Sequence, residues 1–186
     1  MSSTSRRRLN ESSRRRSASN CSGSKRSRDH RKRVMGQTDM ELFSGGTIKD
    51  IHIIQLARHE LLLESIVSAI GDLKLSHAVV LGAVGSLRKL VYHQPVEEVG
   101  SVVREADCTI DEPMEILSLS GTVMNSVPHF HIVVSGANRL YGGHVKMGTE
   151  VLSIAEITVA SLENLPLERR MGPYNQRKLF PYTSMA

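Results

Sequence analysis

The stretch PHFHIVVSGANRLYGGHV, Pro128–Val145, combines a strand-like alternation of side chains with a turn signal and three histidines. In its first half, alternate positions are apolar, namely Phe130, Ile132 and Val134. Successive side chains of a β-strand point to opposite faces of the sheet. We therefore expect a strand with one face in the core, while His129 and His131 lie together on the other face.

The letters GAN at 136–138 indicate a turn, so the chain is expected to return as a second strand. With a loop of even length centred on this turn, His131 lies directly opposite His144, and His129 is the diagonal neighbour of His144. Opposed residues have Cβ atoms about 4.5–5.5 Å apart, and diagonal ones about 7–8 Å. A loop of odd length would turn His144 to the other face. Gly142 and Gly143 leave bare backbone beside the histidines, which suits close approach by a ligand or a second subunit.

Two interpretations of the three histidines stay open on spacing alone. Either they form one site for zinc or another divalent metal, because neutral imidazole is a common ligand of such ions, or they are separate solvated or hydrogen-bonded residues. Three histidines without a fourth protein ligand would resemble an open zinc site rather than a closed structural one. Glu115, from a neighbouring strand or subunit, is a candidate ligand or hydrogen-bond partner of a ligand. An exposed strand glutamate is the simpler interpretation of that residue.

The body from about Phe43 onwards predicts an α+β domain, in which a mainly antiparallel sheet accompanies one long helix. Apolar residues recur at helical spacing in RHELLLESIVSAIGDL, at Leu62, Ile66, Ala69 and Ile70. We expect a helix from about His59 to Ile70, with Gly71 as its stop.

Short strands should follow the helix. Besides the two strands of the hairpin, the strand-like runs are HAVVLGAV, LRKLVYH, EEVGSVVREADCTI, MEILSLSGTVM and IAEITVASL. A turn at Gly85-Ser86 is expected between the first two of these runs. Three prolines and mixed charge predict an irregular segment over residues 166–186.

Charge divides the chain into two parts of opposite sign. Residues 1–33 carry Glu11 and Asp29 against twelve basic residues: Arg6, Arg7, Arg8, Arg14, Arg15, Arg16, Lys25, Arg26, Arg28, Arg31, Lys32 and Arg33. Their net charge of +10 leaves −5 for the remainder, because the whole chain is +5. Residues 1–40 contain too few apolar side chains to offset the entropy of folding, so a disordered basic tail is expected. Contact with nucleic acid is expected first from this tail, although a solvated arm without a specific role fits the same charge.

No apolar run approaches the ~20 residues that a membrane-spanning helix needs, and the basic N-terminus lacks the apolar stretch of a secretory signal. The run KRSRDHRKR fits a nuclear-localisation cluster, so we expect a nuclear or cytoplasmic protein that is not secreted. Ser86, Ser118 and Ser120 show no spacing that links them to a base. Catalysis is therefore not expected, although hydrolysis by a zinc-bound water stays open.

Four motifs in order resemble the PPC domain, the plant-and-prokaryote-conserved domain that is also called PCC and is often associated with an AT-hook. They are AVVLGAVGSL, MEILSLSGTV, PHFHIVVSGANRLYGGHV and AEITVASL, and the similarity runs over about residues 47–165. The resemblance implies an α/β domain with a mainly antiparallel sheet that assembles as a homotrimer. It also implies that the residues matching its H-x-H and GGH motifs hold a metal, and these are His129, His131 and His144.

In plants, such domains follow an AT-hook in nuclear DNA-binding regulators, and prokaryotic members are mostly the free domain without an established activity. The AT-hook core Arg-Gly-Arg-Pro is absent from residues 1–40, whose only glycines are Gly23 and Gly36. Recognition of A·T tracts is therefore not implied. The expected contacts of the tail are with phosphate groups and are independent of the base sequence. We interpret the chain as an oligomeric, nucleic-acid-associated regulatory protein. The alternative is a trimeric metal- or small-ligand-binding protein, with or without enzymatic activity.

Overall fold

The computed structural model describes residues 41–100, 102–172 and 177–182. The chain divides into two units, residues 1–40 and residues 41–186, and the described residues all belong to the second. The predicted basic tail, with its twelve lysines and arginines, lies outside the described residues. No helix in the described part of the chain has the length and apolar character needed to cross a membrane.

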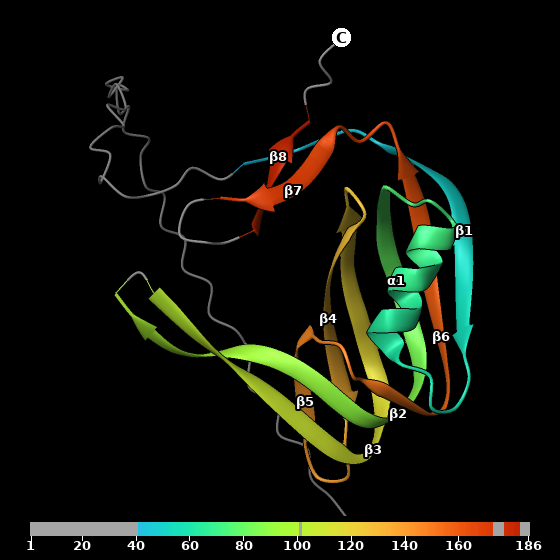
Figure 1. Ribbon diagram of the computed structural model, residues 1–186, viewed down its shortest axis with the longest axis vertical. Helices are drawn as coiled ribbons and strands as arrows, with labels where there is room; N and C mark the ends of the chain where they lie inside the picture. The colour runs from blue at the N-terminus through green and yellow to red at the C-terminus, as the bar shows by residue number, and fades with distance from the viewer. Residues whose placement is uncertain (1–40, 101, 173–176, 183–186) are drawn as a thin grey trace, which may run out of the picture. The chain divides into compact units, whose positions relative to one another are not determined.

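The described residues form one α-helix and eight strands (Figure 1). In chain order these are β1 (Thr47–Leu56), α1 (Leu62–Asp72), β2 (His77–Val99), β3 (Val102–Met124), β4 (Val127–Ser135), β5 (Leu140–Val145), β6 (Glu150–Glu163), β7 (Leu167–Met171) and β8 (Arg177–Pro181). Every strand pair is antiparallel. The predicted combination of a mainly antiparallel sheet with one helix is therefore confirmed.

Six strands form one sheet in the order β1-β6-β2-β3-β4-β5, and β7 and β8 form a separate pair. The last strand of the sheet, β5, also pairs with β2 through Tyr92↔Val145 and His93↔His144. The strands from β2 to β5 therefore close on themselves, and the β4–β5 hairpin is held by β3 on one side and by β2 on the other. Figure 1 shows α1 lying along the face of the sheet near β1, β6 and β2.

A single hydrophobic cluster joins α1 to all six strands of the sheet. In the helix, Leu62, Ile66 and Ile70 are buried, as the helical spacing predicts. On β4, the predicted apolar face is buried as well, with exposures of 2%, 1% and 0% for Phe130, Ile132 and Val134. Burial of this face leaves the opposite face of β4 to the histidines.

Helix α1 begins three residues later than its sequence pattern suggests. His59 has φ = 71°, in the left-handed region that a right-handed helix cannot include. Leu61 instead forms an isolated bridge with Glu150 at the start of β6. At the other end, Gly71 lies inside the helix, and Lys74 takes the left-handed conformation with φ = 53°. The start of the helix thus depends on a contact with a distant strand.

The expected turn at Gly85-Ser86 is wrong, because β2 runs without interruption through these residues. Gly85 has φ = 134° beside a shift of register against β6. A Cβ at this position would collide with the backbone of Ile154 and Ala155. The glycine therefore marks a β-bulge with close backbone approach, and not a chain reversal. In the same way, two runs expected as separate strands continue into one another within β3 from Val102 to Met124, while the first three residues of the earlier run, 97–99, end β2.

The expectation of an irregular segment over residues 166–186 is also wrong, because β7 and β8 pair within it. Leu167 is buried, and its carbonyl oxygen lies 2.6 Å from His77 Nε2 on β2. Pro181 ends β8, a position at which the missing N–H costs the ladder little. The hairpin is short and rich in arginine, so hydrophobic alternation did not reveal it.

Candidate metal centre

The β4–β5 hairpin has the register that an even loop predicts. His131 is the partner of His144, and Ser135 is the partner of Leu140. The three imidazole rings lie on one side of the hairpin, with centroid separations of 5.2 Å for His129–His131, 4.9 Å for His129–His144 and 5.5 Å for His131–His144. The three histidines named from the sequence are therefore neighbours in space.

The histidines open on a cavity of about 400 Å³. One ring nitrogen from each of His129, His131 and His144 lies within 4.8 Å of the other two. The remaining lining residues come from β2, β3 and β5, and they are His93, Gln94, Pro95, Glu105, Gly142 and Gly143. Chemically, the arrangement offers several imidazole nitrogens to one occupant of the cavity.

Gly142 and Gly143 lie beside the histidines as expected, but the space above their Cα atoms is already filled by the sheet. A Cβ on Gly142 would lie 2.6 Å from the carbonyl oxygen of Ile132, and one on Gly143 would lie 2.6 Å from that of His93. Such distances are too short for a real side chain, so β5 fits between β4 and β2 only with glycine here. Both glycines also line the cavity, and the expected approach of a ligand or second subunit beside them stays a prediction.

A fourth histidine, His93 of β2, belongs to the cluster and was not singled out from the sequence. Its ring stacks on His144, with centroids 4.6 Å apart and 16° between the ring planes. Its Nε2 lies 3.8 Å from a Glu105 carboxylate oxygen, and its Nδ1 lies 3.9 Å from one of Asp107. The pairing of β2 with β5 places His93 beside His144. No local pattern in the sequence predicts that pairing.

Two histidines of the cluster are held in the neutral form. Burial lowers the pKa of the His144 imidazole to about 4, with a further contribution from the other three histidines. The pKa of His129 is also lowered, first by burial and then by the positive charge of Arg169. A neutral imidazole has one nitrogen with a free lone pair. At neutral pH these two side chains can therefore act as ligands without first losing a proton.

Glu115 lies apart from the histidines within the chain. It is the partner of Ser135, four residues beyond His131 on β4, which corresponds to about 13 Å along a strand. It lines a different cavity, together with Ser135 and Gly136 near the end of β4. The expectation that Glu115 reaches the histidines from a neighbouring strand is therefore wrong. A contribution from a neighbouring subunit stays a prediction.

The family model of the Plants and Prokaryotes Conserved (PCC) domain matches residues 43–163. This range contains α1, the six-stranded sheet and all four histidines of the cluster. The chain belongs to the PCC domain family, which is also called PPC, and the resemblance read from its motifs is confirmed.

A curated relative covers a smaller part of the chain. The bifunctional protein GlmU of Synechococcus sp. (strain JA-3-3Ab) is 34% identical over 99 residues, which are 50% of this chain. The aligned part amounts to 14% of the length of that protein. The similarity therefore concerns one segment of the larger protein.

Two solved structures share the fold. A metal-containing protein of Archaeoglobus fulgidus is 24% identical with a TM-score of 0.62, over 78% of this chain and 100% of that chain. A protein of Bacteroides thetaiotaomicron that is thought to bind DNA is 17% identical with a TM-score of 0.60, over 73% of this chain and 96% of that chain. At these identities the similarity shows the fold alone.

Proposed function

We propose that the folded unit binds one divalent transition-metal ion, most simply zinc, through His129, His131 and His144. The observation that carries this proposal is the approach of one ring nitrogen from each histidine to within 4.8 Å of the others. The A. fulgidus protein of the same fold contains a metal, which supports the proposal from outside the chain.

The donor set suits such an ion. Zinc binds imidazole nitrogen at about 2.0–2.1 Å in a tetrahedral arrangement, which places ligand nitrogens about 3.3 Å apart. The nitrogens of the cluster are at most 4.8 Å apart, and His129 and His131 are exposed, so modest rotation of these rings brings the three together. When bound, an ion with three histidine ligands supplies one open coordination position, as in open zinc sites.

Metal analysis of the purified full chain tests this proposal. We expect about one equivalent of zinc per chain after loading, and loss of most of it in His131→Ala. His59→Ala is the matched control, because His59 lies outside the cluster and contacts Glu150 at 2.7 Å. Less than about a tenth of an equivalent in the loaded wild type, or full binding by His131→Ala, would contradict the proposal.

We propose further that the folded unit assembles as a homotrimer. Apolar side chains are exposed on the sheet face opposite the core, where Ile51, Ile53 and Val84 are 62%, 70% and 62% exposed. Ile53 is the partner of Thr158 and Val84 the partner of Glu156, so both lie on the same face of β6. An apolar face of this kind commonly packs against another protein surface. Sedimentation should give three times the chain mass, and a monomer at micromolar concentration would contradict the proposal.

A second proposed function belongs to residues 1–33, which carry a net charge of +10. We propose that they contact nucleic-acid phosphates without reading sequence, as part of a nuclear or cytoplasmic regulatory protein. The remainder of the chain carries −5 and repels phosphate. The B. thetaiotaomicron protein of the same fold is thought to bind DNA, which favours this association.

Salt dependence tests the nucleic-acid proposal. A tail that neutralises about six phosphates should lose on the order of 10³-fold affinity between 50 and 200 mM salt. Deletion of residues 1–33 should abolish binding to a short DNA duplex. Undiminished binding after the deletion would place the contact on the folded surface instead.

A further inference from the structure

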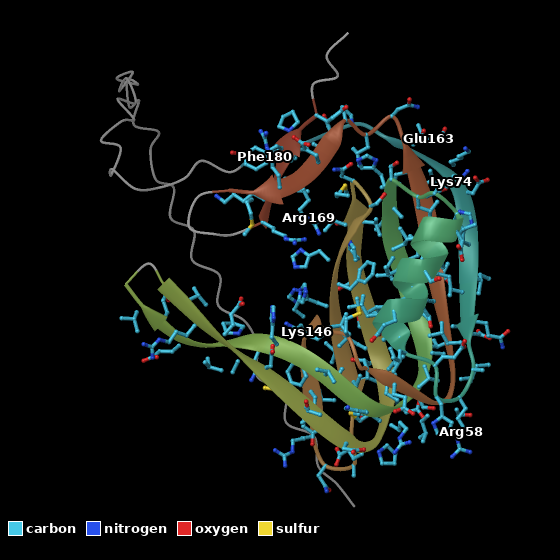
Figure 2. All side chains as sticks on the ribbon, viewed as in Figure 1. Arg58, Lys74, Lys146, Glu163, Arg169 and Phe180 are labelled. Atoms are coloured by element: carbon cyan, nitrogen blue, oxygen red, sulfur yellow. The ribbon has the colours of Figure 1, made fainter. Side chains whose placement is uncertain are left out.

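The β7–β8 hairpin lies outside the range matched by the family model and brings an arginine to the histidine cluster. Arg169 projects from β7 toward the sheet (Figure 2), and its Nη2 donates a hydrogen bond of 2.9 Å to Thr122 Oγ1 on β3. Thr122 is the direct partner of His129 on β4. Because opposed residues have Cβ atoms about 4.5–5.5 Å apart, the guanidinium group lies next to His129, and after burial its charge contributes to lowering the pKa of that histidine.

Arg169 retains an unused hydrogen-bond donor. Its Nη1 is buried and has no hydrogen-bond partner among the described residues. Within the same part of the chain, no carboxylate lies at ion-pair distance from this guanidinium. A buried charged donor without a partner is costly. The arrangement therefore favours a bound group that brings negative charge and accepts hydrogen bonds.

Arg177 adds a second positive charge to the same place. Arg169 is the partner of Leu179 on β8, which makes Arg177 its diagonal neighbour on the same face of the hairpin. Leu167 at one end of this face is buried, whereas Arg177 at the other end is exposed. Burial lowers the pKa of both His129 and Arg169, and the positive charge of Arg177 contributes to lowering both. Arg177 also has no ion pair with a carboxylate of the described residues.

Two carboxylates lie at the His93 side of the cluster, and within the described part of the chain neither forms an ion pair with Arg169 or Arg177. Asp107 lies 3.5 Å from Lys146 Nζ, and Glu105 lies 3.8 Å from His93. Histidine ligands bring no negative charge to a divalent ion, so a metal here would add to the charge of the two arginines. A bound oxyanion would offset part of this positive charge. His129, next to Arg169, lines a cavity of about 400 Å³, a volume typical of small-molecule sites, and neither arginine is among the residues that line it.

We propose that Arg169 and Arg177 form an anion-binding subsite beside the histidine cluster, which holds the phosphate or carboxylate group of a small molecule. The planar fork of arginine matches both groups through paired hydrogen bonds. Arg169 as a whole is partly exposed, so the group reaches the guanidinium from solvent. Where the same oxyanion also ligates the metal ion, the subsite rests on the metal-binding function proposed above.

Calorimetric titration of the zinc-loaded full chain with inorganic phosphate, and separately with acetate, tests the subsite and distinguishes the two anions. Arg169→Gln should weaken binding of the preferred anion at least about tenfold, because a hydrogen bond to a charged group is lost. Arg170→Gln is the matched control, since the Arg170 guanidinium lies 4.2 Å from the Phe180 ring and 3.5 Å from Glu168. The control should bind the anion like the wild type, and both variants should keep their zinc.

Metal content and anion affinity together separate the two proposals. Anion binding that depends on Arg169, in a protein that takes up no zinc on loading, supports the subsite and contradicts the metal site. Zinc-loaded wild type that binds neither anion, or that binds equally well after Arg169→Gln, overturns the subsite alone. Loss of zinc in Arg169→Gln also overturns it, because the arginine would then act on the metal site itself. Should Arg169→Gln fail to fold, Arg169→Lys, which keeps the charge without the fork, should show a several-fold loss, and wild-type affinity there overturns the subsite.

Discussion

The two faces of β4, a strand of nine residues, differ in burial and in chemistry. Phe130, Ile132 and Val134 are at most 2% exposed and belong to the core, whereas His129 and His131 are exposed and line the cavity. Alternation of side chains along a strand makes this division possible. The comparison teaches that the core and the proposed metal site use different residues of one strand, so that the side chains of either face can be changed separately.

The largest effect is expected on the core face. Phe130→Ala should lower the free energy of unfolding by about 3–5 kcal/mol, because it removes a buried aromatic ring and leaves a cavity. Urea unfolding of the metal-free protein measures this change. Val133→Ala, on the other face and 41% exposed, is the control and should cost less than about 1 kcal/mol. Equal losses of unfolding free energy at the two positions would show that the two faces of β4 do not differ in their contribution to stability.

Zinc should act through the histidine face alone. A ligand that binds only the folded state at one hundred times its Kd stabilises it by about 2.7 kcal/mol. We expect a stabilisation of this size in the wild type and almost none in His131→Ala, measured by urea unfolding with and without zinc. The same zinc-dependent gain in both proteins would show that the ion binds elsewhere.

Acid should destabilise the metal-free protein through His144. Its pKa is about 4 in the folded state, against an ordinary value of 6.5. Between pH 6.5 and 4, His144 is protonated in the unfolded state and neutral in the folded state. The free energy of unfolding therefore falls as the pH drops from 6.5 toward 4. Above pH 6.5 this histidine has no such effect. His144→Gln should flatten the dependence in this window, and an NMR titration midpoint for His144 near 6.5 would contradict it.

The smallest change in stability is expected for a substitution on the histidine face of β4. In the metal-free protein, His131→Ala should change the free energy of unfolding by less than about 0.5 kcal/mol, because the side chain is exposed and is not part of the hydrophobic core cluster. Urea unfolding followed by circular dichroism measures it. A loss approaching that of Phe130→Ala would show that the two faces of β4 are not independent.

The parts of the site that could be predicted are those encoded within eighteen consecutive residues. Alternation in β4 and an even loop set the partner of His131 as His144, and the structure has this pair. The buried stripe of α1 was likewise predicted from Leu62, Ile66 and Ile70. In each case the signal is local, because the period of a helix or strand and the length of one turn are properties of neighbouring residues.

What the sequence did not reveal depends on contacts between distant segments. His93 reaches the cluster only because β5 closes onto β2, and Gly85 continues a strand only because the backbone of Ile154 and Ala155 packs against it. The same holds for Arg169, which approaches the histidines through a hydrogen bond to Thr122, 47 positions away.

The sequence by itself determined which side chains alternate, which turn reverses the chain at the hairpin and where the positive charge is concentrated. The tertiary structure decided which distant strands pair, and with them the fourth histidine and the arginine at the site. The physical reason is that periodicity and turn chemistry are set by adjacent residues, whereas strand pairing is selected by burial of the whole core.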